Sequence, residues 1–281
     1  MSAIYPLVST SWLTERLSSP EITIADASWY LASAGRDARA EYQAAHIPGA
    51  VFFDIDAISD KASALPHMLP DAAAFDSSMR KLGIGNAHTV VIYDGAGIFS
   101  APRAWWMLRA MGHKHVAVLD GGLPKWKKEG RQLDNKPVEI HLSHFHAHPD
   151  PEFIRSYEQV HANLATQAEQ IIDARSPGRF NGTEAEPRPG LKSGHIPGSL
   201  NLHYSDLLAP DGTMRDADTL KKLFKDRGID LHKPAVTSCG SGVTASIVLL
   251  ALEIAGAKQV ALYDGSWAEW GSREGAPIER G

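Results

Sequence analysis

Cys239 is the only cysteine among the 281 residues, and its setting in the sequence suits a reactive thiol. It follows the β-branched run 235–238 and precedes Gly240, Ser241, Gly242 and a long apolar stretch. This pattern predicts a strand, a tight loop and the start of a helix. Unpaired N–H groups and the dipole at a helix start stabilise a thiolate, which is the nucleophilic form of cysteine. The sequence therefore favours a nucleophile over a buried structural cysteine, the usual role of a lone cysteine.

The loop after Cys239 has the composition of an anion-binding nest of backbone donors. Gly240 and Gly242 let the chain curl around the sulfur without a Cβ clash. The Ser241 hydroxyl is a candidate donor toward a bound substrate, with an ordinary loop role as the alternative. We predict that substrate is also bound by the backbone of the remaining loop residues, Gly240, Gly242, Val243 and Thr244.

Composition excludes several classes of partner. The chain is 43% hydrophobic and 22% charged, as in a globular protein with a sizeable core. Its formal net charge of −5 gives no general attraction to nucleic acid or to an anionic membrane. One cysteine permits no intramolecular disulfide, and a reactive thiol is best kept reduced, which predicts the cytoplasm.

An internal repeat organises the elements that position Cys239. Four landmarks recur in the same order in both halves: 24–27 with 171–174, 45–50 with 194–199, 90–95 with 236–240, and 119–122 with 263–266. His46 and His195 share one repeat position, which predicts a structural hydrogen bond in both halves. Asp94 is the counterpart of Cys239, and a carboxylate cannot perform thiol chemistry.

Short β-branched runs alternate with helical patterns in each half. This alternation predicts an α/β protein of two tandem domains, each a mostly parallel sheet flanked by helices. In such sheets ligands bind beyond the carboxyl ends of the strands, where Cys239 lies. We place a domain without catalytic cysteine at 1–136, a linker at 137–151 and a catalytic domain at 152–281.

The proposed linker contains His141, His144, His146 and His148. Alternating histidines on an extended strand are compatible with a metal ion. No cysteine or helical histidine pair completes a recognisable site, so we interpret the segment as a solvated linker without a metal.

The chain resembles the two-domain sulfurtransferases of the rhodanese family, and most closely their 3-mercaptopyruvate sulfurtransferase branch. The resemblance covers essentially the whole chain. It rests on the loop 239–245, the paired His-Ile-Pro-Gly segments, and the motifs Phe52-Phe53-Asp54-Ile55-Asp56, His67-Met68-Leu69-Pro70, 100–106, Gly178-Arg179-Phe180 and Glu186-Pro187-Arg188-Pro189-Gly190. The expected fold of the family agrees with the tandem domains predicted from the repeat.

The resemblance implies a persulfide on Cys239 and two arginines, Arg179 and Arg188, that hold the carboxylate of the donor. The alternative for both arginines is a surface position in a polar loop. The resemblance further implies a proton relay that joins Asp56 and His67 to Ser241, a role suited to a histidine oriented by a carboxylate.

The neutral pair Gly240 and Ser241 implies 3-mercaptopyruvate as donor, because thiosulfate-preferring relatives carry cations there. The predicted acceptor is cyanide, a small thiol or a reduced dithiol protein such as thioredoxin, and no cofactor is implied. Two alternatives remain: a thiosulfate:cyanide sulfurtransferase and a non-catalytic persulfide carrier. A cysteine phosphatase is disfavoured because Ala245 stands where the phosphate-binding arginine is needed.

Overall fold

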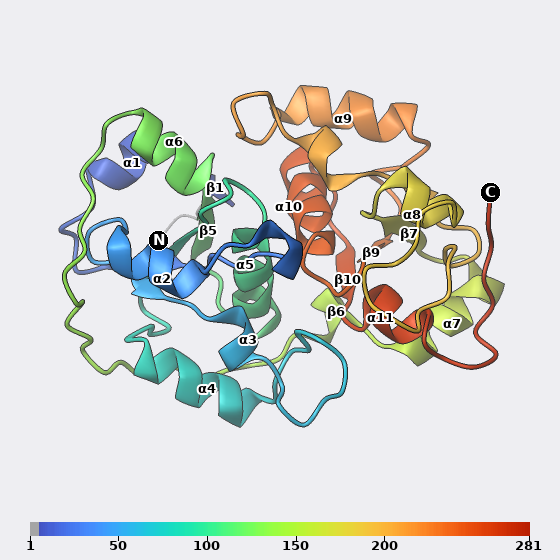
Figure 1. Cartoon of the computed structure of the whole chain (residues 1–281), viewed down its shortest axis with the longest axis horizontal. Coiled ribbons are helices and arrows are strands. Elements are labelled where there is room, and N and C mark those ends of the chain that lie inside the picture. Colours follow the sequence, from blue (N-terminus) through green and yellow to red (C-terminus); the bar gives the residue numbers. More distant parts are fainter. Residues whose placement is uncertain (1–5) are drawn as a thin grey trace. The chain divides into compact units, whose positions relative to one another are not determined.

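The computed structural model describes residues 6–281 and contains two parallel five-stranded sheets flanked by helices (Figure 1). The predicted α/β class with one sheet in each half is therefore confirmed. Contacts divide the chain into two compact units. Unit 1 comprises Met1–Asp60, Pro70–Asp150 and Pro210–Met214; unit 2 comprises Lys61–Leu69, Pro151–Ala209 and Arg215–Gly281. No helix within residues 6–281 is both long and apolar enough to cross a membrane.

The sheet of unit 1 has the strand order β1-β5-β4-β2-β3, with every pair parallel. Its strands are β1 (Leu7–Val8), β2 (Ile22–Asp26), β3 (Val51–Phe52), β4 (Thr89–Tyr93) and β5 (Val116–Leu119). The helices are α1 (Thr10–Thr14), η1 (Ala32–Ala34), α2 (Ala38–Ala44), α3 (Ile55–Ile58), α4 (Ala72–Lys81), α5 (Ala101–Ala110) and α6 (Gly122–Lys128). One core cluster joins alternate residues of the sheet to α1 and α6 through Leu13 and Trp126.

Unit 2 repeats this arrangement with the order β6-β10-β9-β7-β8, again all parallel. Its strands are β6 (Ile154–Arg155), β7 (Gln170–Asp173), β8 (Leu200–Asn201), β9 (Ala235–Ser238) and β10 (Val260–Tyr263). The helices are η2 (Pro151–Phe153), α7 (Tyr157–Thr166), α8 (Pro177–Asn181), η3 (Tyr204–Leu207), α9 (Ala217–Asp226), α10 (Ala245–Ala255) and α11 (Ser266–Trp270). Figure 1 shows α10 beside β9 and β10, with α9 packed against it.

Burial explains why these segments form the elements they do. Helix α10 is apolar on almost all sides and its residues are nearly all buried, as expected for a central helix between a sheet and α9. It ends at Gly256, whose φ of 101° provides the left-handed C-cap. The opposite face of the sheet carries Trp267 and Trp270 of α11, packed with Val160 of α7.

Strand register confirms the equivalence of Asp94 and Cys239. In unit 1 Asp26 pairs with Tyr93, and in unit 2 Asp173 pairs with Ser238. Since Asp26 and Asp173 are the same landmark of the repeat, the residues that follow the two paired strands, Asp94 and Cys239, hold the same position.

Each compact unit includes a short segment from the other half of the sequence. In unit 2 the Leu69 N–H donates to Asp264 Oδ2 at 2.7 Å, and in unit 1 the Met214 N–H donates to Asp120 Oδ1 at 2.8 Å. Asp264 and Asp120 are equivalent, because each directly follows the last long strand of its sheet. The boundaries predicted from the sequence stay predictions, and they do not include these two crossing segments.

The segment between the halves is only partly solvated, which corrects the sequence-based interpretation. Phe145 and Ala147 are buried, and the Phe145 ring lies 5.7 Å from that of Phe75. Asn86 of unit 1 also holds this segment: its N–H donates to the His144 carbonyl, and its Oδ1 accepts the His146 N–H. Alternating apolar residues among the histidines explain the packing. Within residues 6–281, no group of three or more His, Cys, Asp or Glu side chains is arranged to hold a metal ion.

Candidate active site around Cys239

Cys239 lies between the end of β9 and the loop that leads into α10, and the residue is only 2% exposed. Its N–H donates to Ser266 Oγ at 3.3 Å, and its carbonyl accepts the Trp267 N–H at 2.9 Å. The Gly240 carbonyl accepts the Ala268 N–H at 2.9 Å. The first turn of α11 therefore holds the backbone of the thiol loop in place.

The loop between Cys239 and α10 is rich in backbone donors. Gly242 has a φ of 80°, a left-handed conformation that glycine adopts without strain. Within the described chain, no acceptor takes a hydrogen bond from the backbone N–H of any residue from 240 to 244. Together with the first turn of α10, these donors form surroundings suited to an anion.

The corresponding loop of unit 1 contains its own anion. The Asp94 carboxylate is fully buried and accepts four backbone hydrogen bonds of 2.8 to 2.9 Å, from Ala96, Phe99, Ser100 and Ala101. This geometry shows that the loop scaffold of the repeat can surround a negative charge with N–H groups. In unit 2 the residue at the same position is the thiol.

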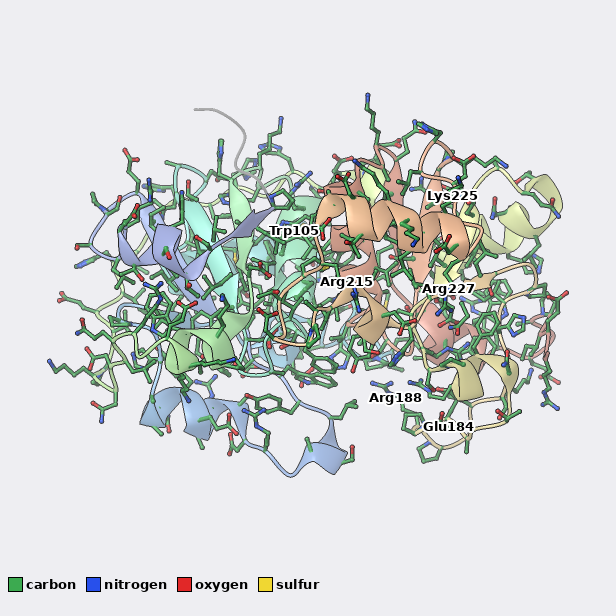
Figure 2. The ribbon with its side chains drawn as sticks, turned by 90° about the horizontal axis from the view of Figure 1, so that it is seen from above. Trp105, Glu184, Arg188, Arg215, Lys225 and Arg227 are labelled. Carbon is green, nitrogen blue, oxygen red and sulfur yellow. The ribbon has the colours of Figure 1, made fainter. Side chains whose placement is uncertain are left out.

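The two predicted substrate arginines both lie over the thiol loop. A Cβ built on Gly240 would be 3.0 Å from Arg179 Nη2 and 3.6 Å from Arg188 Nη1. Arg188 Nη2 also donates to Ser241 Oγ at 3.2 Å. Arg188 and Glu184, both labelled in Figure 2, belong to the loop that follows α8. The structure thus brings Cys239, Ser241 and both arginines together, and a side chain at position 240 would require the Arg179 guanidinium to shift.

The two residues of the predicted relay are placed differently. His67 is buried in the crossing segment of unit 2, two residues before Leu69, whose N–H is held by Asp264. It has a φ of 62°, which a residue with a Cβ rarely adopts. Asp56 belongs to unit 1, where its carboxylate accepts a 2.9 Å hydrogen bond from Trp29 Nε1. A relay from Asp56 to Ser241 stays a prediction.

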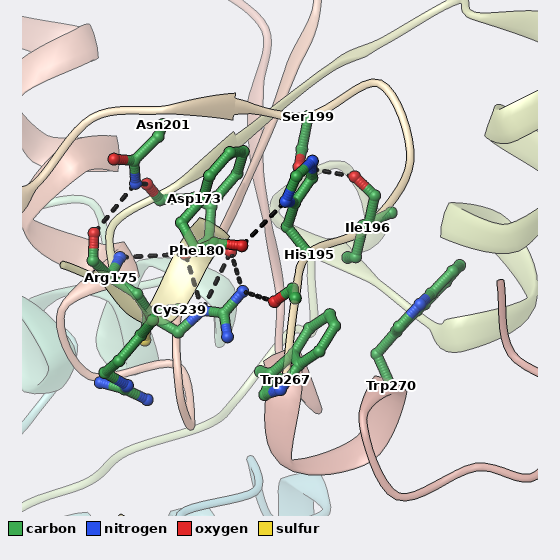
Figure 3. Close-up of polar contacts among 12 residues, drawn as sticks. Asp173, Arg175, Phe180, His195, Ile196, Ser199, Asn201, Cys239, Trp267 and Trp270 are labelled. Atoms are coloured by element: carbon green, nitrogen blue, oxygen red, sulfur yellow. Dashed lines mark hydrogen bonds and ion pairs between the residues drawn. The ribbon is translucent and has the colours of Figure 1, made fainter. Parts of the chain in front are cut away.

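A buried chain of alternating charges supports Arg179, and sequence reasoning missed it. The Arg175 guanidinium makes two-pronged contacts with Asp173 and lies 4.2 Å from the ring of Trp267 (Figure 3). Arg175 Nη1 donates to Glu186 Oε1 at 2.7 Å. Glu186 in turn accepts hydrogen bonds from Nε and Nη2 of Arg179. The charges therefore alternate along Asp173, Arg175, Glu186 and Arg179.

The electrostatics of this row of ion-paired side chains favour the charged form of Arg175. Burial opposes the charge of Arg175, but the adjacent carboxylates of Asp173 and Glu186 outweigh it and raise the pKa of Arg175. The sequence offered one hint of this residue. Arg175 directly follows the repeat landmark 171–174, and its counterpart after landmark 24–27 is the small polar residue Ser28.

His203 is a further titratable group near the arginines that the sequence did not single out. It follows β8, and its Nδ1 lies 2.6 Å from Ser205 Oγ. Burial lowers the pKa of His203, Asp206 opposes this effect, and the positive charge of Arg179 adds to it. The imidazole is therefore biased toward its neutral form.

The repeated histidines make the structural hydrogen bond that the repeat predicted. His46 Nδ1 lies 2.8 Å from the Tyr42 carbonyl, and His195 Nδ1 lies 2.8 Å from the Phe180 carbonyl (Figure 3). The rings of Phe180 and His195 are also stacked, with centroids 3.7 Å apart. Both histidines thus fix the loop that carries the His-Ile-Pro-Gly segment.

Comparison with known proteins gives consistent matches over both units. The model of the rhodanese-like domain matches residues 9–129 and 156–273. Human 3-mercaptopyruvate sulfurtransferase is 46% identical over 270 residues, covering 94% of this chain and 91% of the relative. Mouse thiosulfate sulfurtransferase is 44% identical over 280 residues, covering 97% and 93%. The crystal structure of SseA from Escherichia coli, described as a 3-mercaptopyruvate sulfotransferase, superposes with a TM-score of 0.86 at 42% identity, covering 94% and 99%.

Proposed function

Because the chain belongs to the rhodanese family, we propose that it is a sulfurtransferase that takes sulfur from 3-mercaptopyruvate and carries it as a persulfide on Cys239. The observation that carries this proposal is the meeting of one thiol, a donor-rich loop and two arginines in unit 2. The relatives named 3-mercaptopyruvate sulfurtransferase support the choice of donor.

In the first half-reaction the Cys239 thiolate attacks the sulfur atom of 3-mercaptopyruvate. A sulfur–sulfur bond forms, the carbon–sulfur bond of the donor breaks, and its electron pair leaves on carbon as the enolate of pyruvate. A proton supplied at that carbon completes pyruvate. Arg179 and Arg188 hold the donor carboxylate, and the arginine fork suits its planar geometry.

We assign Ser241 to the oxygen of the departing enolate. Its Oγ accepts from Arg188 and therefore has its own proton available for a substrate oxygen. His67, in the crossing segment of the same unit, is the proposed source of the proton, with Asp56 as its predicted partner. The backbone donors of residues 240 to 244 stabilise the anionic persulfide once it forms.

In the second half-reaction an acceptor nucleophile attacks the outer sulfur of the persulfide. The sulfur–sulfur bond breaks, the acceptor leaves with the sulfur atom, and the Cys239 thiolate is regenerated. Cyanide gives thiocyanate, a thiol gives a new persulfide, and a reduced dithiol protein such as thioredoxin releases sulfide as its own disulfide forms. A chain with one essential thiol works best in a reducing compartment, and we propose the cytoplasm.

The donor is tested by steady-state kinetics with cyanide as the common acceptor. We expect kcat/KM for 3-mercaptopyruvate to exceed that for thiosulfate by at least about tenfold, equivalent to about 1.4 kcal/mol of transition-state stabilisation. A higher kcat/KM for thiosulfate would overturn this assignment in favour of the thiosulfate:cyanide alternative.

The enzyme is distinguished from a passive persulfide carrier by a double replacement of Arg179 and Arg188 with alanine. An enzyme that holds the donor carboxylate loses persulfide loading from 3-mercaptopyruvate by at least about a hundredfold. Loading at the wild-type rate would support the carrier instead. Far-UV circular dichroism confirms that the variant is folded.

A further inference from the structure

The carboxylate of Glu186 stands between two arginines that have different functions. Its side chain is 2% exposed, and it joins the buried Arg175 to Arg179, the arginine that reaches the thiol loop. Breaking either contact would leave a charged group in a desolvated position, which is costly. Glu186 therefore anchors the Arg179 guanidinium to the buried Arg175.

Glu186 also sets the direction of the Arg179 guanidinium. It takes the edge formed by Nε and Nη2, while Nη2 also lies beside Gly240. In the described part of the chain, Nη1 of Arg179 makes no hydrogen bond. The carboxylate thereby turns the opposite edge of the guanidinium away from the ion-pair chain.

The charges of the four ion-paired side chains cancel. Asp173 and Arg175 form one pair, and Glu186 and Arg179 form the second, so the four side chains together are neutral. Arg179 consequently offers directed donors without adding net charge. A monoanionic carboxylate needs well-placed donors, whereas a dianion gains more from uncompensated positive charge.

Unit 1 contains a related pair that serves as an internal control. Arg36 bonds to Glu41 through Nε and Nη2, and Arg36 Nη2 also approaches the Gly95 carbonyl at 3.3 Å. Gly95 follows Asp94 as Gly240 follows Cys239. The same charge pair therefore stands over the equivalent loop of the unit that lacks a thiol.

We propose that Glu186 is a positioning and specificity-determining residue: it orients Arg179 and balances its charge, so that the site favours a carboxylate donor over dianionic thiosulfate. This inference rests on the proposed function and names the residue that sets its donor preference. It predicts that the charge and the length of Glu186 have separable effects.

The charge is tested with Glu186→Gln, with Glu41→Gln as the matched control. For Glu186→Gln we expect kcat/KM for 3-mercaptopyruvate to fall about tenfold and that for thiosulfate to fall less or to rise. The ratio of the two should move at least about fivefold toward thiosulfate, most strongly at low ionic strength. Glu41→Gln changes the net charge of the chain equally and should leave the ratio at its wild-type value.

The length is tested with Glu186→Asp, which keeps the charge but withdraws the carboxylate. This variant should lower kcat with both donors and leave their ratio within about twofold of wild type. If Glu186→Gln fails to fold, Glu186→Asp at raised ionic strength still separates the effect of charge from that of length. This variant keeps the negative charge, so its ratio of kcat/KM values for the two donors should shift with salt concentration as the wild-type ratio does. Equal losses for both donors in Glu186→Gln, or the same shift in Glu41→Gln, would overturn the proposal. A wild-type enzyme that prefers thiosulfate would instead contradict the proposed function, whatever the variants do.

Discussion

The loops that follow β4 and β9 share one scaffold and differ in the source of the negative charge that they surround. In unit 1 the charge is built in, because the Asp94 carboxylate takes four backbone N–H groups. In unit 2 Cys239 stands at that position, and the N–H groups of residues 240 to 244 have no acceptor within residues 6–281. In the proposed mechanism, the persulfide of unit 2 uses the same backbone arrangement that holds the structural anion of unit 1.

The side chains that lie over the two loops also differ between the units. A Cβ on Gly95 would be 2.1 Å from the Tyr30 hydroxyl and 3.4 Å from Arg36 Nη2, so the unit 1 loop is closed by side chains that bond to Glu41. Over Gly240 the covering groups are the guanidiniums of Arg179 and Arg188. One loop is closed by a tyrosine, and the other is lined by donors suited to a carboxylate.

The largest expected effect comes from giving unit 2 the residue of unit 1. Cys239→Asp should abolish sulfur transfer, with a loss of at least about a thousandfold. The new carboxylate should accept the loop N–H groups and raise the free energy of unfolding by about 1–2 kcal/mol. Activity assays and urea unfolding measure the two effects. Cys239→Ser is the control: it should lose activity without gaining stability, and equal stability of the two variants would contradict the comparison.

The reverse change removes the built-in anion of unit 1. Asp94→Ala leaves four N–H groups without their acceptor, those of Ser100 and Ala101 fully buried, and should lower the free energy of unfolding by about 2–4 kcal/mol. Urea unfolding gives this value. Asp94→Asn keeps one acceptor oxygen and should lose less. A stability loss below about 0.5 kcal/mol in Asp94→Ala would show that the N–H groups do not depend on the carboxylate.

A smaller effect on activity should distinguish the crossing segment of unit 2 from that of unit 1. Asp264→Ala releases Leu69 near His67 in unit 2, so kcat should fall about tenfold, with a change in the pH profile of kcat. Asp120→Ala removes the equivalent bond to Met214 in unit 1 and should leave the pH profile unchanged. Identical profiles for both variants would mean that the segment carrying His67 only adds stability.

The smallest expected effect concerns acid stability and arises in unit 1. Burial lowers the pKa of His113 to about 4 from its ordinary value of 6.5. As pH falls below 6.5, the unfolded chain binds a proton that the folded chain excludes, so stability is lost between about pH 6.5 and 4. Unit 2 has Ala257 after the equivalent glycine and lacks this titration.

The free energy of unfolding of the wild type should fall between pH 7 and pH 5. In His113→Gln this fall should be smaller by about 1 kcal/mol. Urea unfolding at both pH values measures it. The result that would contradict the assignment is an unchanged difference between the two pH values in His113→Gln.

Local pattern in the sequence was enough to predict the repeat, the parallel sheets and the equivalence of Asp94 and Cys239, because strand runs and glycine loops are local features. The resemblance supplied Arg179 and Arg188, which lie over Gly240, and their role in substrate binding stays a prediction. The Arg175 to Glu186 ion pair was missed because a buried charge is recognised by its partner, which only folding brings near.

Long-range packing explains the other differences. The Leu69 to Asp264 hydrogen bond joins distant parts of the sequence, so no local signal places His67 in unit 2. Phe145 is flanked by histidines that suggested a solvated linker, yet its ring is buried against Phe75. In both cases the decisive contact is tertiary.

The central claim is most directly tested by the intact mass of the protein after exposure to 3-mercaptopyruvate without an acceptor. We expect a protein heavier by one sulfur atom, with the extra mass on the peptide that contains Cys239 and lost on addition of cyanide. An unchanged mass in a preparation that still turns over 3-mercaptopyruvate with cyanide would contradict it.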